Sequence, residues 1–166
     1  ALEAGATPEG CRAAIRSFRP LRHRLEVLPT GGAVEFVDDS IATTPERTLA
    51  GLRSYAEPIV LLLGGRHKDL PLDTLSVAVA ARCRAVVAFG EAGDLFASAV
   101  RAIGSDVAVE RVDDVDAAVR SAARLAHGGD VVLFSPAGTS FDAYPNFERR
   151  GEAFRAAVAA LDGATQ

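Results

Sequence analysis

The sequence predicts an α/β fold: a mostly parallel β-sheet flanked by helices, with a β-hairpin at its N-terminal end. From residue 59 onwards, short apolar runs alternate with segments of helical periodicity, which is typical of parallel strands joined by crossover helices. Before residue 59, two segments of alternating polarity surround Thr30-Gly31-Gly32, a turn sequence typical of a hairpin. At 166 residues the chain is long enough for one domain with a full hydrophobic core.

The N-terminal segment is predicted to be separate from this domain. Pro8 favours the start of a short helix that runs to about Phe18, with Ala13, Ala14 and Ile15 on the same face as Phe18. The chain opens with Ala-Leu-Glu-Ala-Gly and contains no Met. We therefore expect residues 1–20 to be the tail or linker helix of an upstream segment, and residues 21–166 to form the domain.

The next elements are predicted from local patterns. Residues 24–28 and 33–37 alternate in polarity and form the arms of the hairpin. Thr43-x-x-Glu46, with Pro45 inside it, has the pattern of a capping box and predicts a helix to about Ser54. The aliphatic run at 59–63 predicts a strand that is buried on both faces.

The rest of the chain continues the alternation of helix and strand. In residues 113–126, for example, apolar side chains recur at helical spacing. The predicted helices are residues 72–82, 93–103, 113–126 and 146–161, and the predicted strands are residues 85–89, 107–110 and 130–134.

Composition excludes several classes of function. The formal net charge of −4 and the scattered arginines give no reason to expect a nucleic acid or an anionic membrane surface as a partner. Cys11 and Cys83 are too few for a disulfide framework or a zinc site, which favours a reducing, cytoplasmic setting. No apolar stretch approaches the ~20 residues that span a bilayer, and no signal peptide is visible. A monomer is the default expectation.

Three polar loops follow predicted strands, and they are the candidate site. The longest runs from Ser135 to Gly151, behind the apolar run that ends at Phe134. The second is Asp38-Asp39-Ser40-Ile41-Ala42-Thr43-Thr44-Pro45, and the third is Gly64-Gly65-Arg66-His67-Lys68-Asp69. In open α/β sheets, ligand sites form at the carboxyl ends of strands, where hydroxyls and free N–H groups suit a carboxylate or a phosphate. We expect the three loops to outline one crevice.

Each of these candidate features also has a simpler structural interpretation. The sheet pattern is Rossmann-like, but G-x-x-x-x-G-K-[ST] is absent and no G-x-G-x-x-G follows the first strand, which weakens a dehydrogenase reading. Lys68 is a surface lysine or a ligand-binding cation, and Phe147 is a core residue or a pocket wall. Glu148-Arg149-Arg150 is expected to be a solvated helical face. His67 is expected to be a loop residue, while His23 and His127 stand alone without metal-ligand spacing.

Several motifs in order along the chain resemble the C-terminal domain of the Mur ligases, and among these the glutamate-adding branch. The resemblance covers nearly the whole chain from Leu21 onwards. Its markers are Asp39-Ser40-x-Ala42-Thr43, Leu62-Leu63-Gly64-Gly65-x-x-Lys68, Ser135-Pro136-Ala137-x-x-Ser140-x-Asp142 and Asn146-Phe147-Glu148-x-Arg150-Gly151.

The resemblance implies an enzyme of three domains, of which this is the one that receives the amino acid. A UDP-sugar domain and a central ATPase domain, which would carry the P-loop, the Mg²⁺ ligands and a carbamylated lysine, would lie outside this chain. ATP would phosphorylate the carboxylate of UDP-N-acetylmuramoyl-L-alanine, and the glutamate amine would then attack the acyl phosphate. The full-length ligase would release ADP and phosphate, and the isolated domain is expected to be inactive.

The resemblance also implies a role for individual residues. The glutamate would be held by Lys68, Thr43, Ser140, Phe147 and the backbone N–H of Phe141. Arg24 and Asp39 would face the nucleotide. No catalytic or metal-binding residue is expected in the chain, and the domain would contribute by positioning its substrate.

Some positions depart from the family pattern. Ile41 stands where the family has a lysine, so one cation on the nucleotide side is missing, and Arg66-His67 replaces the usual acidic residue before the lysine. Gly138-Thr139 and Phe141 also differ from the commonest version. These residues do not decide between D-glutamate, the family default, and the branch that adds L-glutamate. On the fold pattern alone, a stand-alone nucleotide- or metabolite-binding module and a non-catalytic interaction domain also stay open.

Overall fold

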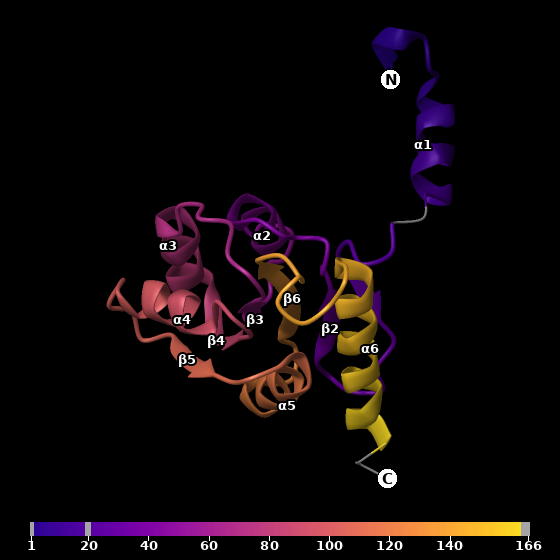
Figure 1. Ribbon diagram of the computed structural model, residues 1–166. Coiled ribbons are helices and arrows are strands. Elements are labelled where there is room, and N and C mark those ends of the chain that lie inside the picture. Colours follow the sequence, from indigo (N-terminus) through magenta and orange to yellow (C-terminus); the bar gives the residue numbers. More distant parts are fainter. Residues whose placement is uncertain (1, 19–20, 164–166) are drawn as a thin grey trace.

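The chain folds around one sheet of six strands, whose order is β1-β2-β6-β3-β4-β5 (Figure 1). The computed structural model describes residues 2–18 and 21–163. The β1–β2 pair is antiparallel and all the other pairs are parallel, which confirms the predicted α/β sheet with its N-terminal hairpin. The strands are β1 (Glu26–Leu28), β2 (Glu35–Asp38), β3 (Ile59–Gly64), β4 (Cys83–Phe89), β5 (Ala108–Arg111) and β6 (Val131–Ala137).

Helices cover both faces of the sheet, so the core has two layers. The central strand β3 is fully buried and alternates between them: Leu61 and Leu63 belong to one layer, and Val60 and Leu62 to the other. Helices α2, α3 and α4 close the first layer, and α5 and α6 close the second. The described helices are a 3₁₀ turn at Leu2–Ala4 and α1 (Pro8–Ser17), α2 (Pro45–Leu52), α3 (Asp73–Arg82), α4 (Gly93–Arg101), α5 (Val115–Leu125) and α6 (Phe147–Gly163).

Helix α1 lies apart from the sheet (Figure 1). The Thr7 hydroxyl caps it by accepting from the N–H of Gly10, and Pro8 occupies the first turn, as predicted. None of its residues is buried, and the predicted apolar face is exposed: Ile15 is 76% exposed and Phe18, just beyond the helix, is 72% exposed. Residues 1, 19 and 20 of the predicted upstream segment lie outside the described residues. No helix in the described part of the chain combines the length and the apolar character that a bilayer span requires.

The start of α2 differs from the predicted capping box. Pro45 is the first helical residue, so the N-cap is Thr44, and its side chain makes no capping hydrogen bond. Proline favours the first position of a helix, where no N–H is needed, and this places the cap one residue later than the Thr43-x-x-Glu46 pattern suggested. The Thr43 hydroxyl is therefore not part of a cap.

Strand β6 extends through Ser135, Pro136 and Ala137, which the sequence assigned to a loop. Proline fits there because β2 stops pairing with β6 at Phe134, and β6 carries one extra residue against β3 before Ala137 pairs with Gly64. At the edge of the sheet, β1 begins later than the predicted residue 24. His23 and Leu25 have positive φ angles of 61° and 44°, which a strand does not accommodate.

Candidate functional site

The carboxyl ends of β2, β6 and β3 lie next to one another, so their three polar loops meet. Backbone hydrogen bonds join them directly. The N–H of Ala137 donates to the carbonyl of Ala42 over 3.0 Å. Arg66 and Thr139 exchange two bonds, of 2.9 and 2.8 Å, between the loops after β3 and β6. The three loops therefore meet, as predicted, and the crevice that they were expected to outline stays a prediction.

The paired glycines at the end of β3 allow this close approach. A Cβ on Gly64 would lie 2.5 Å from the carbonyl oxygen of Phe89, and one on Gly65 would lie 2.1 Å from that of Thr139. Gly65 also has a φ of 89°, a conformation that favours glycine. The Gly64-Gly65 pair thus lets the loop that carries Lys68 lie directly against its neighbours.

Arg150 joins the loops after β2 and β6 by hydrogen bonds from the first turn of α6. Its burial contradicts the prediction that Glu148-Arg149-Arg150 is a solvated face. Its side chain is fully buried. The guanidinium donates to the Ser40 hydroxyl (3.2 Å), to the Ser40 carbonyl (2.9 Å) and to the Gly138 carbonyl (3.0 Å). Burial lowers the pKa of Arg150 to about 10. Glu148 and Arg149 are exposed, as expected.

Lys68 and Thr43 are brought together, although 25 residues separate them. The Lys68 ammonium donates to the Thr43 hydroxyl over 3.2 Å. Lys68 is the only lysine in the sequence and its side chain is exposed. The neighbouring His67 instead supports its own loop, because one ring nitrogen contacts the Leu70 carbonyl and the other accepts from the N–H of Asp69. An ammonium and a hydroxyl at this edge can bind a carboxylate together.

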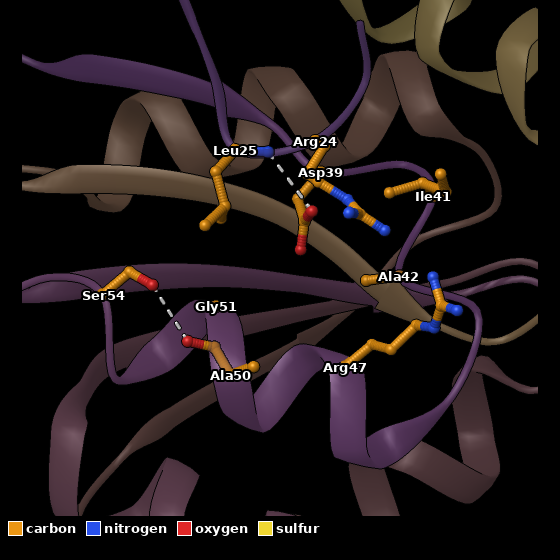
Figure 2. Close-up of a pocket in the computed structure, with 9 residues that line it drawn as sticks. All are labelled: Arg24, Leu25, Asp39, Ile41, Ala42, Arg47, Ala50, Gly51 and Ser54. Atoms are coloured by element: carbon orange, nitrogen blue, oxygen red, sulfur yellow. Dashed lines mark hydrogen bonds between the residues drawn. The ribbon is translucent and has the colours of Figure 1, made fainter. Parts of the chain in front are cut away.

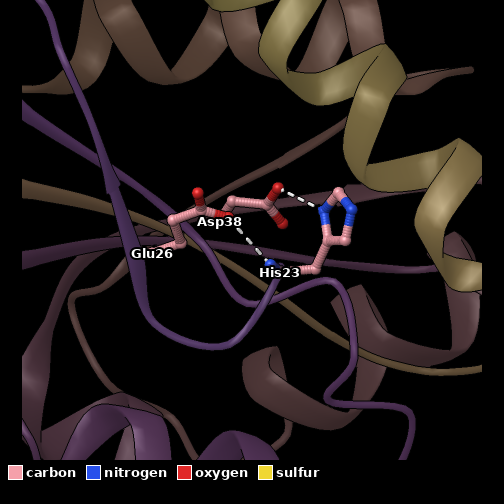
Figure 3. A group of neighbouring side chains, drawn as sticks. All are labelled: His23, Glu26 and Asp38. Atoms are coloured by element: carbon pink, nitrogen blue, oxygen red, sulfur yellow. Dashed lines mark hydrogen bonds and ion pairs between the residues drawn. The ribbon is translucent and has the colours of Figure 1, made fainter. Parts of the chain in front are cut away.

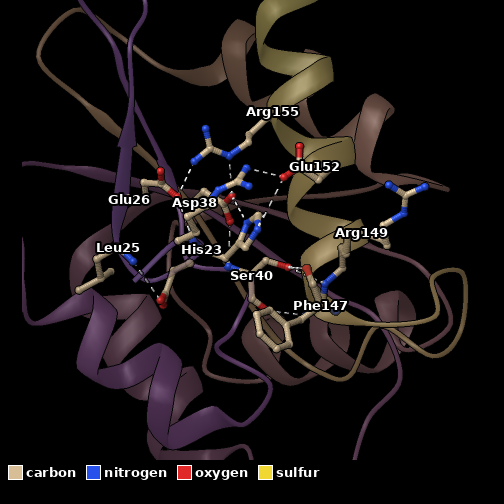
Figure 4. Close-up of polar contacts among 12 residues, drawn as sticks. His23, Leu25, Glu26, Asp38, Ser40, Phe147, Arg149, Glu152 and Arg155 are labelled. Atoms are coloured by element: carbon tan, nitrogen blue, oxygen red, sulfur yellow. Dashed lines mark hydrogen bonds and ion pairs between the residues drawn. The ribbon is translucent and has the colours of Figure 1, made fainter. Parts of the chain in front are cut away.

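Ser140, Phe141 and Phe147, the other three residues predicted to bind the amino acid, lie between β6 and the first residue of α6. Ser140 is buried and Phe141 is 62% exposed. Within the described ranges, no hydrogen bond links the Ser140 hydroxyl to Lys68 or Thr43. Phe147 begins α6, and its carbonyl accepts a 2.8 Å bond from the Ser40 hydroxyl (Figure 4). Its half-buried ring helps to line an apolar hollow of about 670 Å³ together with Leu21 and Ile41.

Arg24 and Asp39, predicted to lie on the nucleotide side, share a second cavity of about 210 Å³ (Figure 2). Asp39 is 5% exposed, and its carboxylate accepts from the Ser135 hydroxyl (2.8 Å) and from the N–H of Leu25 (3.3 Å). Burial raises the pKa of Asp39 to about 6, and the hydrogen bonds from Ser135 and Leu25 only partly oppose this rise. Asp39 therefore fixes the turn that carries Arg24 and also contributes to the cavity wall.

The raised pKa of Asp39 leads us to predict that the stability of the protein depends on pH. The folded state binds the Asp39 proton more tightly than the unfolded state, because the pKa is about 6 in the folded state and 3.8 ordinarily. The stabilisation by this proton is therefore complete below pH 3.8 and is lost as the pH rises through 6. Between pH 7.5 and pH 4, the free energy of unfolding of the wild type should therefore gain about 2 kcal/mol relative to Asp39→Asn, which has no carboxylate.

Urea denaturation of this chain across that pH range checks the prediction. Asp106→Asn, at an exposed position, is the matched control and should follow the wild type at every pH. If the free energies of unfolding of Asp39→Asn and the wild type differ by the same amount at every pH, the substitution has altered hydrogen bonds only, and the prediction is contradicted.

His23 does not stand alone, as the sequence suggested. It is 3% exposed, and its Nδ1 lies 2.8 Å from the Asp38 carboxylate, with Glu26 beside it (Figure 3). Arg155 from α6 already forms ion pairs with both carboxylates (Figure 4). In the described part of the chain, these three side chains form the only cluster that could hold a metal ion. The positive charge that balances their two carboxylates is already supplied by the Arg155 guanidinium. The cluster joins the hairpin to α6 and does not fit Mg²⁺.

Sequence reasoning missed Arg150, the His23 cluster and Arg47, which lines the cavity of Arg24 and Asp39. A signal was present for Arg150, since it lies four residues before Phe154 and eight before Val158, on the buried face of α6. His23 and Asp38 are 15 residues apart and meet only across the hairpin, so no local pattern reveals them.

Comparison with known sequences identifies one family. Residues 23–138 match the family model "Mur ligase, glutamate ligase domain". The UDP-N-acetylmuramoylalanine–D-glutamate ligase of Nitratidesulfovibrio vulgaris (strain Miyazaki F) is 40% identical over 96% of this chain and 36% of its own length. The enzyme of the same name from Desulfosudis oleivorans is 41% identical over 97% of this chain and 34% of its own length. The chain thus spans about a third of the length of the curated relatives it matches.

Solved structures share the fold at low sequence identity. UDP-N-acetylmuramate-alanine ligase MurC from Thermotoga maritima aligns with a TM-score of 0.67 and 16% identity, over 96% of this chain and 35% of that one. MurF ligase from the same organism, in complex with ADP, aligns with a TM-score of 0.61 and 21% identity, over 87% of this chain and 33% of that one.

Proposed function

Because this chain belongs to the Mur ligase family, by its match to the glutamate ligase domain, we propose that it binds the incoming glutamate in an ATP-dependent amide-forming ligase. The acceptor would be UDP-N-acetylmuramoyl-L-alanine, and the amino acid would be D-glutamate, as in the names of its relatives. The product would be a precursor of peptidoglycan. The observation that carries the proposal is the pairing of Lys68 with Thr43 where three strand-end loops meet.

The proposed roles follow from the chemistry of the donors. Lys68 pairs its ammonium with a carboxylate of glutamate. Thr43 accepts from Lys68, so its own hydroxyl proton is free to donate to the same carboxylate. Ser140 and the backbone N–H of Phe141 supply further donors, and the Phe147 ring walls the site. Holding the amine in one orientation toward the reacting carbonyl is the contribution to catalysis.

The reaction requires more than this chain provides. We propose that ATP phosphorylates the carboxylate of UDP-N-acetylmuramoyl-L-alanine, that the glutamate amine attacks the acyl carbon, and that phosphate leaves, with ADP as the other product. Arg24 and Asp39 would face the nucleotide. Mg²⁺ would be held outside this chain, because Arg155 fills the His23 cluster and no P-loop motif is present. The ligase would work as a monomer in the cytoplasm, without nucleic acid.

Phosphate release by the full-length enzyme tests the proposal. With ATP, Mg²⁺ and UDP-N-acetylmuramoyl-L-alanine, we expect release with D-glutamate and none above background with L-glutamate. Turnover with L-glutamate alone would place the enzyme in the other branch of the family. No release with either isomer would contradict the ligase function. Micromolar binding of ATP by the isolated chain in calorimetry would then favour a stand-alone nucleotide-binding module.

A further inference from the structure

The cavity that holds Asp39 also receives two arginine side chains from different elements. Arg24 comes from the turn before β1, and Arg47 comes from the first turn of α2. Figure 2 shows both guanidinium groups reaching toward the side of the cavity where Ile41 lies, with the Asp39 carboxylate between Arg24 and Leu25. Two cations therefore face one opening of about 210 Å³.

Neither guanidinium is closely paired in the described part of the chain, although the Asp39 carboxylate in the same cavity attracts Arg24 from a longer distance. Among the described residues, no carboxylate lies within 4.0 Å of either guanidinium and neither side chain donates a hydrogen bond. Some exposed arginines are paired, such as Arg66 with Glu91 and Arg124 with Glu110, whereas Arg53 is exposed without a close partner among the described residues. Arg24 and Arg47 differ from Arg53 because they line one cavity together. Two guanidinium groups without close partners outnumber the single Asp39 carboxylate at this cavity, so its opening favours an anion.

We propose that Arg47 is a nucleotide-binding residue, which with Arg24 binds the phosphate groups of the adenine nucleotide. The inference rests on the proposed function and extends it to a position that the sequence motifs do not mark. Ile41, which has no charge, lines the same cavity. Arg47 would thus supply from α2 the second cation that the chain lacks at position 41. A planar guanidinium can bind two phosphoryl oxygens at once.

The position of Arg47 makes it suitable for a clean test. Its side chain is exposed and contacts no carboxylate in the described part of the chain, so Arg47→Ala should fold like the wild type. Arg53 follows the same helix, is also exposed, and is absent from the cavity lining, so Arg53→Ala is the matched control. Ile41→Lys in the Arg47→Ala background places a cation back at the same opening.

In the full-length enzyme, Arg47→Ala should weaken ADP binding in calorimetry by about 10-fold, the usual worth of a hydrogen bond to a charged group. The KM for ATP should rise by a similar factor, while the KM for glutamate should stay unchanged. Arg53→Ala should match the wild type, and Ile41→Lys/Arg47→Ala should recover most of the lost affinity. Arg47→Lys should be intermediate, because it keeps the charge and loses the bidentate geometry.

Binding of ADP is measured without turnover, so the two proposals can fail separately. Absence of phosphate release by the wild-type enzyme contradicts the ligase function and leaves the ADP measurement interpretable. Equal ADP affinity in Arg47→Ala and Arg53→Ala overturns the role of Arg47, whatever reaction the enzyme performs. A rise in the KM for glutamate in Arg47→Ala, with ADP affinity unchanged, also overturns it and places Arg47 on the amino-acid side.

Discussion

Lys68→Ala should lower kcat/KM for glutamate in the full-length enzyme by about 100-fold, since a hydrogen bond between charged groups is worth about 1.5–3 kcal/mol. The ammonium of Lys68 is the cation of the pair, and the substrate carboxylate would be left with hydroxyl and N–H donors only. The KM for ATP should change little, because Lys68 does not line the cavity of Arg24 and Asp39.

The loop itself provides the control for Lys68. Arg66 lies two residues earlier and is equally exposed, but its guanidinium pairs with Glu91, so Arg66→Ala should retain near wild-type kcat/KM for glutamate. Lys68→Arg should recover only part of the activity, because a guanidinium keeps the charge but changes the geometry of the contact. Steady-state kinetics with varied glutamate measures all three variants. Full activity in Lys68→Ala would remove Lys68 from the site.

Arg150→Ala should destabilise the isolated chain by about 3–5 kcal/mol, because it removes three buried hydrogen bonds from a charged donor and a large buried side chain. The buried side chain donates to the Ser40 hydroxyl and to the carbonyls of Ser40 and Gly138. Alanine leaves these acceptors without their donor and also leaves a cavity between the loops. The free energy of unfolding from urea titration is the measurement.

Arg149 offers a matched control for Arg150, being the same residue type one position earlier on the exposed face of α6. Arg149→Ala should change the free energy of unfolding by less than about 0.5 kcal/mol, as surface substitutions usually do. Arg150→Lys should be nearly as destabilising as Arg150→Ala, because one ammonium cannot reach acceptors on two different loops. Equal stability of the variants at positions 149 and 150 would show that the network contributes nothing to the fold.

The sheet and the meeting of the loops could be predicted because both depend on patterns within short segments. Apolar runs such as 59–63 define buried strands, and the carboxyl ends of parallel strands lie at one edge whatever their order. The motif resemblance then selected Lys68 and Thr43, which the structure places in contact. The capping box failed because two adjacent threonines precede Pro45, and the proline selects the second of them.

The remaining features depend on contacts between distant segments. Arg150 is buried because the loops after β2 and β6 offer it acceptors, and polarity alone places an arginine on the surface. Similarly, the bulge that admits Pro136 into β6 exists only because β2 has already ended beside it. Arg47 has no local sequence signal, since the cavity it faces is formed with a turn more than twenty residues away.

The position of β6 also has a consequence for how the protein is made. It is the last strand among the described residues, yet it pairs with β2 on one side and with β3 on the other, Val131 lying beside both Glu35 and Ile59. A nascent chain that has not yet emerged past residue 137 therefore has two strands with open edges and no connection between their loops. Such edges invite pairing with other chains, and closing contacts over so many residues is slow. Cellular abundance should thus depend on how quickly translation passes β6, because synthesis paused after β5 leaves a product exposed to chaperones and proteases.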